Sequence, residues 1–192
     1  MQKVNVKEII KLAATYLQLD DVLKMSIIGG DEDEPSEQTQ KNFDLLFKAV
    51  NLVYEEIACD YIPLKHQEIV EVTERNILFS SLDKKIMQVL SLKNMDEQNV
   101  KYILFPNYIK VPNGTYLLDY SYIPSVVTVE DNLETFSNKV SERVVSYAVA
   151  SEYALINGLF DEATTWKKRF EDAIKVVATK KSLIKLPTRG WF

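Results

Sequence analysis

The sequence predicts an α+β protein, in which a helical bundle carries an inserted antiparallel β-meander and an extended C-terminal tail. Apolar residues recur at three- and four-residue spacing in the first and last thirds of the chain, which is typical of helices buried on one face. Short runs rich in β-branched and aromatic residues fill the middle third. In the closing segment, Pro187 and Gly190 prevent a continued helix.

The composition is that of a folded globular chain. The 192 residues are 46% hydrophobic and 27% charged, with only five glycines and six prolines, so disorder is not expected. A chain of this length fits one domain and can bury about 70% of the surface that its unfolded form exposes. We therefore expect a single domain over 1–192, built from N-terminal helices (1–63), a β-meander insertion (64–125), a C-terminal helical pair (132–181) and the tail (182–192).

The N-terminal part predicts two helices and a loop. The first helix ends near Gln18 and has one apolar face, formed by Val6, Ile9, Ile10, Ala13 and Leu17. Asp20 is placed to cap a short second helix through Leu23. The acidic run 31–40, opened by two glycines, predicts a mobile surface loop.

A long buried helix is expected next, stopped by Pro63. Its apolar residues form a single stripe: Phe43, Leu46, Phe47, Val50, Val53, Tyr54 and Ile57. After it, the pattern changes to β-rich runs at 69–72, 77–79, 85–92, 100–105, 108–111 and 115–123. Asn113-Gly114 between the last two runs supplies the positive φ angles of a tight turn, which predicts a hairpin there.

Two antiparallel helices are expected at the end of the domain, because the turn between them is short. The segment 133–159 places Val140, Val144, Tyr147, Ala148 and Leu155 on one face and ends at Gly158. Asp161 is expected to cap the last helix, whose buried stripe is Ala163, Trp166, Phe170, Ala173, Ile174 and Val177. On its wet side we expect the i,i+4 pairs Lys167–Glu171, Lys168–Asp172 and Glu171–Lys175.

Catalysis and metal or cofactor binding are not expected from the residue types present. His66 is the only histidine and Cys59 the only cysteine, so neither a multi-histidine site nor a zinc cluster of cysteine and histidine can form. His66 receives no functional role, and Cys59 is expected to pack as a small hydrophobe. No serine lies in a nucleophile elbow, and no phosphate-binding glycine motif occurs.

The chain is also expected to be soluble and intracellular. It shows no apolar core of signal-peptide type and no run of about 18 apolar residues, and its single cysteine agrees with a reducing compartment. The formal net charge of −5 is concentrated in the acidic run, and no basic stripe is present. Nucleic-acid binding through phosphate neutralisation is therefore disfavoured.

One aromatic stretch leaves an alternative function open. Tyr116, Leu118, Tyr120 and Tyr122 alternate onto one strand face and could stack on exposed bases, as in a nucleic-acid-binding or regulatory module. Few lysines or arginines are interleaved with them. Packing of this face against a helix or a neighbouring subunit is therefore favoured.

The tail carries the candidate site. Large apolar residues at a chain end are costly to leave in water, since burial of each contributes about 1.5 to 3 kcal/mol. Two interpretations remain: the tail folds back on its own domain, or it docks in a groove on another chain. The expected partner-binding residues are Leu183, Ile184, Leu186, Pro187, Arg189, Trp191 and Phe192.

The order of elements and three local patterns resemble the head-to-tail connector, or adaptor, proteins of tailed bacteriophages. The first is the strand end Tyr120-Ser121-Tyr122-Ile123-Pro124. The second is the helix end 148–159, followed by Glu162, Ala163, Trp166 and Phe170, and the third is Arg189-Gly190-Trp191. The acidic run 31–40 matches no role in that family.

The resemblance implies a structural subunit of the virion neck, made in the cytoplasm of a bacterial host. Such subunits form a ring, commonly of twelve copies, that docks under the portal, extends the DNA channel and receives the tail. The implied partners are the portal protein, tail or further neck proteins, and other copies of the chain, with no membrane. The C-terminal segment 183–192 is expected to contact the portal. A net-negative lumen would let DNA pass without specific binding.

Overall fold

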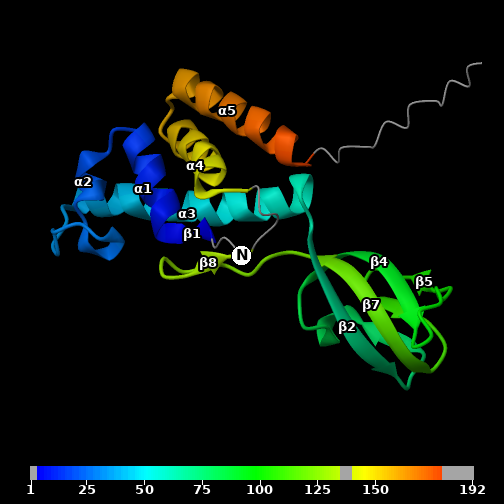
Figure 1. Cartoon of the computed structure of the whole chain (residues 1–192). Coiled ribbons are helices and arrows are strands. Elements are labelled where there is room, and N and C mark those ends of the chain that lie inside the picture. The colour runs from blue at the N-terminus through cyan, green and yellow to red at the C-terminus, as the bar shows by residue number, and fades with distance from the viewer. Residues whose placement is uncertain (1–3, 135–139, 179–192) are drawn as a thin grey trace, which may run out of the picture.

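The computed structural model describes residues 4–134 and 140–178, and within them the chain forms two bodies (Figure 1). The helical body contains α1 (Val6–Tyr16), α2 (Asp20–Leu23), α3 (Glu37–Glu56), α4 (Glu142–Ile156) and α5 (Phe160–Ala178), with the short pair β1 (Val4–Asn5) and β8 (Asn132–Leu133). The β-body contains β2 (Leu64–Val72), β3 (Asn76–Leu78), β4 (Ile86–Asn94), β5 (Ile103–Leu104), β6 (Tyr108–Lys110) and β7 (Gly114–Tyr122). The predicted mixed α+β class is confirmed.

Side-chain caps explain where α1 and α3 begin, whereas Asp20, expected to cap α2, is the first residue of that helix, which has no side-chain cap. Asn5 Oδ1 accepts from the backbone N–H of Glu8 at 3.3 Å, and Ser36 Oγ accepts from that of Thr39 at 3.1 Å. Because Ser36 caps α3, the helix starts inside the acidic run that was predicted to be a loop as far as residue 40. The predicted stop of the long helix is confirmed, since a π-helical turn, Ile57–Tyr61, closes it just before Pro63.

Helix α4 lies at the centre of the helical body, packed against α1, α3 and α5. The predicted stripe of α5 is confirmed at its two fully buried members, Phe170 and Ile174. Trp166, another member of the stripe, is partly buried, and its ring stacks on Tyr16 of α1 with 4.8 Å between ring centroids. The core of the body is thus apolar at its centre and aromatic at its edge.

Four predictions for the C-terminal half were wrong. Asp161 does not cap the last helix but is its second residue, because α5 begins at Phe160. The helix expected from residue 133 begins at Glu142, because Leu133 pairs with Val4 in the short β1–β8 ladder. Leu155, expected on the buried face, is exposed in the last turn of α4, where it lines a hollow beside α5. Lys167, expected to pair with Glu171, instead donates to Glu56 of α3 at 2.8 Å.

The β-body holds two three-stranded antiparallel sheets, ordered β2-β7-β4 and β3-β6-β5. Strand β7 is central and pairs with β2 along its whole length, from Leu64 opposite Tyr122 to Val72 opposite Gly114. This is not the order of a meander, in which each strand pairs with the next one in the chain. The hairpin predicted between β6 and β7 was also wrong, since the two strands belong to different sheets.

The turn at Asn113-Gly114 therefore joins two sheets. The Asn113 side chain accepts from the backbone N–H of Arg75 at 2.8 Å, and the Tyr116 hydroxyl donates to the carbonyl of Pro112 at 2.9 Å. Both bonds tie the turn to its surroundings rather than close a two-residue loop. A local turn signal cannot specify which strands its two arms will join.

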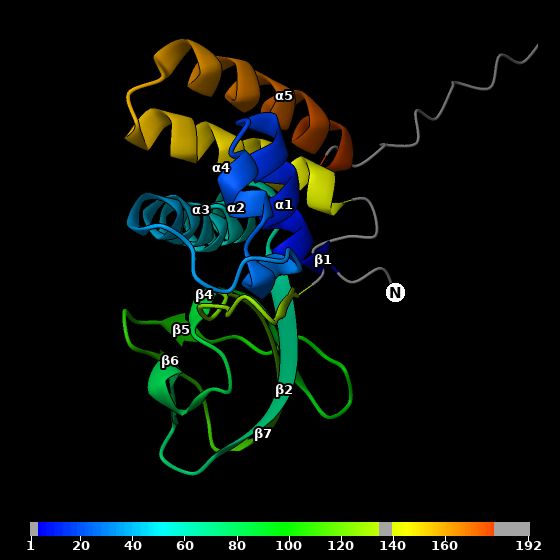
Figure 2. The same cartoon turned by 90° about the vertical axis from the view of Figure 1, so that its left-hand side faces the viewer.

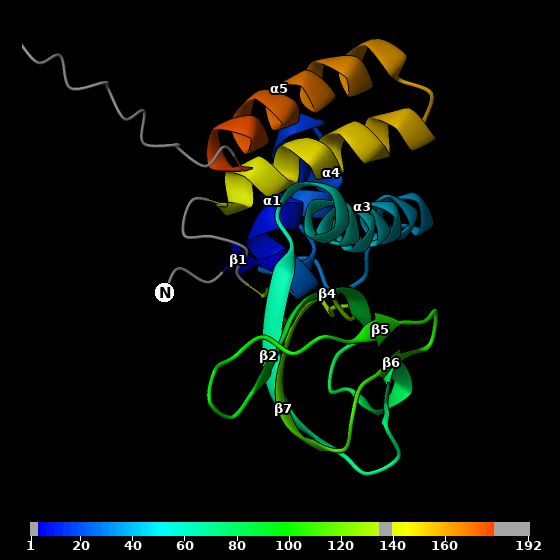
Figure 3. The ribbon, with the colours of Figure 1, turned by 90° about the vertical axis from the view of Figure 1, so that its right-hand side faces the viewer.

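Two chain segments connect the bodies, one from the end of α3 into β2 and one from β7 back to β8 (Figures 2 and 3). The β-body projects from one side of the helical layer, so most of its surface faces away from the helices. None of the helices in the described ranges combines the length and apolar character that a membrane span requires.

Phe170→Ala should destabilise the protein by about 3–5 kcal/mol, because it leaves a cavity in a fully buried part of the helical body. Urea unfolding followed by circular dichroism measures the change. Val176→Ala on the same helix is the matched control, since its side chain is exposed, and should change stability by less than about 0.5 kcal/mol. Equal effects of the two substitutions would contradict the buried stripe.

Candidate functional site

The tail predicted as the partner-binding site lies outside the described residues. This applies to all seven of its candidate positions: Leu183, Ile184, Leu186, Pro187, Arg189, Trp191 and Phe192. The described part of the chain offers other sites, namely a polar junction between the bodies, a groove along α3 and two exposed apolar surfaces.

The aromatic face of β7 is buried. Tyr116, Leu118, Tyr120 and Tyr122 all point into the interior, and each is less than a tenth exposed. The expected packing against a helix or a neighbouring subunit is not what buries this face, since it is already buried within the single chain. No ring of this set is exposed to stack on a base, which counts against the alternative of a nucleic-acid-binding module.

The two bodies meet at the carboxylate of Glu134, just after β8. The Tyr122 hydroxyl from β7 donates to it, and Lys84 Nζ from the β3–β4 connection donates to its other oxygen at 3.1 Å. The backbone N–H of Glu134 in turn donates to the Tyr54 hydroxyl of α3 at 3.0 Å. Four segments that are distant in the sequence are therefore held together by one residue.

Burial sets the protonation of this junction. It raises the pKa of Tyr54 to about 12, partly opposed by the Glu134 N–H bond, and it raises the pKa of Tyr122 further, aided by the adjacent carboxylate. For Glu134, burial also favours the protonated form, but the hydrogen bonds from Tyr122 and Lys84 outweigh it, so its pKa lies below the usual value. At neutral pH the junction therefore combines neutral tyrosines with an ionised carboxylate.

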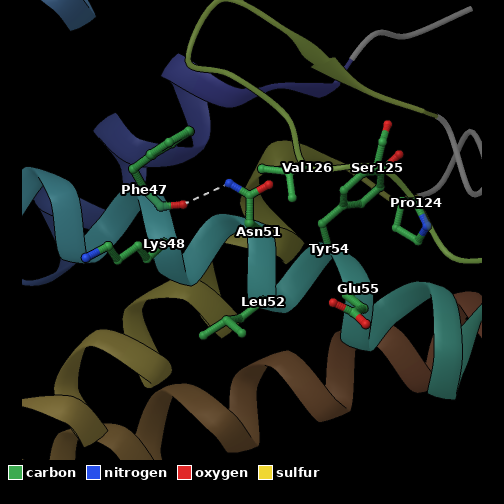
Figure 4. Close-up of a pocket in the computed structure, with 9 residues that line it drawn as sticks. All are labelled: Phe47, Lys48, Asn51, Leu52, Tyr54, Glu55, Pro124, Ser125 and Val126. Carbon is green, nitrogen blue, oxygen red and sulfur yellow. Dashed lines mark hydrogen bonds between the residues drawn. The ribbon is translucent and has the colours of Figure 1, made fainter.

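A groove of about 470 Å³ runs between α3 and the segment 124–126 (Figure 4). Asn51 and Tyr54 extend from α3 toward this segment, and Asn51 accepts from the Val127 N–H at 2.9 Å. Leu52 and Val126 are its most exposed apolar residues, at 56% and 83%. The groove is mainly apolar and lacks the convergent polar groups of a catalytic pocket.

Two other exposed apolar surfaces differ in charge. The apolar tip is the α4–α5 turn, where Leu155, Ile156, Leu159 and Phe160 are exposed beside Asp161 and Glu162. The basic hollow, of about 490 Å³, lies on the β-body and is lined by Tyr102, Ile103, Arg75, Lys101 and Lys110 among others. Among residues 4–134 and 140–178, no ion pair joins these three cations to a carboxylate.

The structure also brings His66, Glu68 and Asp83 together. His66 and Glu68 lie two residues apart on β2, so their side chains share one face, and Asp83 reaches them from the β3–β4 connection. Histidine and cysteine spacing does not reveal this group, because two of its three members are carboxylates from separate segments. The His-x-Glu spacing lies just before the β-run predicted at 69–72 and becomes informative only because β2 begins earlier, at Leu64, and nothing in the sequence places Asp83 beside it.

Comparisons with known proteins add no relative. No model of a protein family matches the sequence, and no curated protein matches it. The architecture and the surfaces described above are therefore the structural grounds for a function.

The Glu134 junction makes stability depend on pH on the acid side. The pKa of Glu134 is lower in the folded protein than its ordinary value near 4.5, so the ionised carboxylate stabilises the fold above that value. This contribution is lost as the pH falls below 4.5 and through the folded pKa. In urea unfolding between pH 7 and 3, Glu134→Gln should therefore be less stable near neutral pH and lose less stability on acidification.

Glu71→Gln is the control for this measurement, because Glu71 is exposed on the outer face of β2. It removes one carboxylate without touching the junction. If the wild type and Glu134→Gln lose stability in parallel over the acidic range, Glu134 is not the coupling residue.

Proposed function

We propose that this protein is a structural subunit of a phage head-to-tail connector ring that docks under the portal, extends the DNA channel and receives the tail. Support comes from the resemblance in element order and local sequence patterns. The observation that carries the proposal is that the apolar tip and the basic hollow are complementary surfaces on different bodies of one chain. A subunit with two such surfaces can bind a second copy and still offer a surface to a third.

The complementarity is both apolar and electrostatic. The tip presents four exposed apolar side chains bordered by Asp161 and Glu162, and the hollow presents Tyr102 and Ile103 bordered by three cations. Apolar contact supplies most of the affinity at an interface, while opposite charges at its rim favour the correct partner and orientation. Like surfaces would repel one another, so tip-to-tip and hollow-to-hollow pairing are disfavoured.

The positions of the two surfaces favour a ring. In Figure 1 the α4–α5 turn lies at the end of the helical body away from the β-body, which carries the hollow. A contact between two different surfaces is heterologous, and its repetition gives a closed ring whenever the rotation between neighbours permits. A dimer with twofold symmetry would instead use one surface twice.

The remaining parts of the proposal come from the resemblance. We place the ring, commonly of twelve copies in such proteins, in the virion neck between the portal and the tail or further neck proteins. Residues 183–192 would contact the portal. The net charge of −5 suits a channel through which DNA passes without binding.

Charge reversal tests the contact between copies. The protein is mixed with portal particles of its phage and imaged by electron microscopy, where an added ring of density is expected. Lys101→Glu with Lys110→Glu should abolish the ring by placing like charges together, and the further changes Asp161→Lys with Glu162→Lys should restore it. The control Lys41→Glu with Lys65→Glu, at exposed positions outside both surfaces, should leave the ring intact.

A deletion at the C-terminal end tests the proposed contact with the portal. Deletion of residues 183–192 should abolish docking to portal particles, because it removes the apolar and arginine side chains expected to bind there. Helical content should stay nearly constant, since the described core lies within residues 4–134 and 140–178. Circular dichroism and thermal melting check this, and a collapse in thermal stability would instead show that the segment folds back on its own domain.

A further inference from the structure

Three ligand atoms converge between β2 and the β3–β4 connection. One atom each from His66, Glu68 and Asp83 lies within 4.8 Å of the other two. His66 Nε2 lies 3.8 Å from Asp83 Oδ2. This separation is longer than a hydrogen bond, so a direct bond between the two groups does not account for their arrangement.

Two of these ligand atoms are buried and lack a hydrogen-bond partner. In the described part of the chain, His66 Nε2 and Glu68 Oε1 are the buried side-chain polar atoms without one. The other oxygen of Glu68 accepts from the backbone N–H of Asp83 at 3.3 Å, which fixes the carboxylate. Buried polar atoms are normally satisfied. The Tyr120 phenol interacts with the Glu68 carboxylate, so His66 Nε2 is the atom that most requires an explanation.

The surroundings hold the imidazole in position. The Tyr120 and Tyr122 rings lie nearly perpendicular to it, with ring centroids 5.7 and 6.3 Å from that of His66. The burial that raises the pKa of Tyr120 to about 12 is reinforced by the nearby charge of Glu68, so the phenol stays neutral beside the cluster. The neighbouring cation Lys84 is directed to Glu134 instead.

From these observations we infer that His66, Glu68 and Asp83 form a binding site for a divalent transition metal ion, with zinc as the favoured ion. An imidazole nitrogen and two carboxylates form an N/O ligand set that suits zinc and related ions, whereas magnesium and calcium prefer oxygen ligands alone. The two negative charges neutralise the ion. Water would complete the coordination shell.

To bind zinc, the ligand atoms of His66 and Asp83 need to move only slightly closer together. Zinc bonds of about 2.1 Å in a tetrahedral site place ligand atoms about 3.4 Å apart. The Asp83 side chain is 75% exposed, so it can move toward His66 and shorten their 3.8 Å separation to this value. A bound ion would tie β2 to the connection that carries Lys84, and so would also restrain the Glu134 junction. This inference is independent of the proposed connector ring.

Zinc chloride is the probe, with the full chain purified without a histidine tag. His66 is the only histidine, so the imidazole signals in a long-range ¹H–¹⁵N spectrum report on one residue. We expect these signals to shift with saturation at one zinc ion per chain, and calorimetry to give the affinity. His66→Ala, Glu68→Gln and Asp83→Asn should each weaken binding by about tenfold or more.

Two controls make the result specific to this site. Glu71→Gln, on the opposite face of the same strand, should bind zinc like the wild type, and magnesium chloride should leave the imidazole signals unchanged. Asp83 is exposed, so the Asp83→Asn variant is expected to fold like the wild type, and circular dichroism checks this. An absence of zinc-dependent shifts, or retention of affinity by the Asp83 variant, would overturn the inference.

Discussion

The arrangement of the two bodies depends on the hydrogen bonds that Glu134 makes with both of them. Tyr122 and Lys84 bring it hydrogen bonds from the β-body, and its backbone N–H binds Tyr54 of α3. Only two chain segments connect the bodies, so few other contacts can fix their relative orientation. The Glu134 side chain is still 46% exposed, so these bonds specify the orientation by their geometry and contribute only modestly to stability.

A second contact supports the same connection. Asn51 of α3 binds the backbone of Val127 through both its oxygen and its nitrogen, which holds the segment returning from β7 against the helix. Both contacts restrain the part of the chain that lies between the apolar tip and the basic hollow. The proposed ring would need such restraint, since an error in the angle between its two binding surfaces accumulates at each copy and prevents closure.

The sequence predicted the features that depend on local pattern and failed where distant segments compete. Periodicity identified the stripe of α5 that contains Phe170, and the alternation of β7 identified the face that contains Tyr120. The turn at Asn113-Gly114 was assigned to a hairpin, because a turn signal does not state which strands will pair. Leu133 was assigned to a helix, because its partner Val4 lies at the other end of the chain.

By itself, then, the sequence determined the mixed α+β class, the apolar faces and the residue types available for chemistry. Those properties follow from spacing and composition, which are local. Only the tertiary structure decided that β7 is central, that Glu134 joins four segments, and that His66, Glu68 and Asp83 meet. Each of these depends on contacts between residues far apart in the chain, whose choice is set by the free energy of packing the whole molecule.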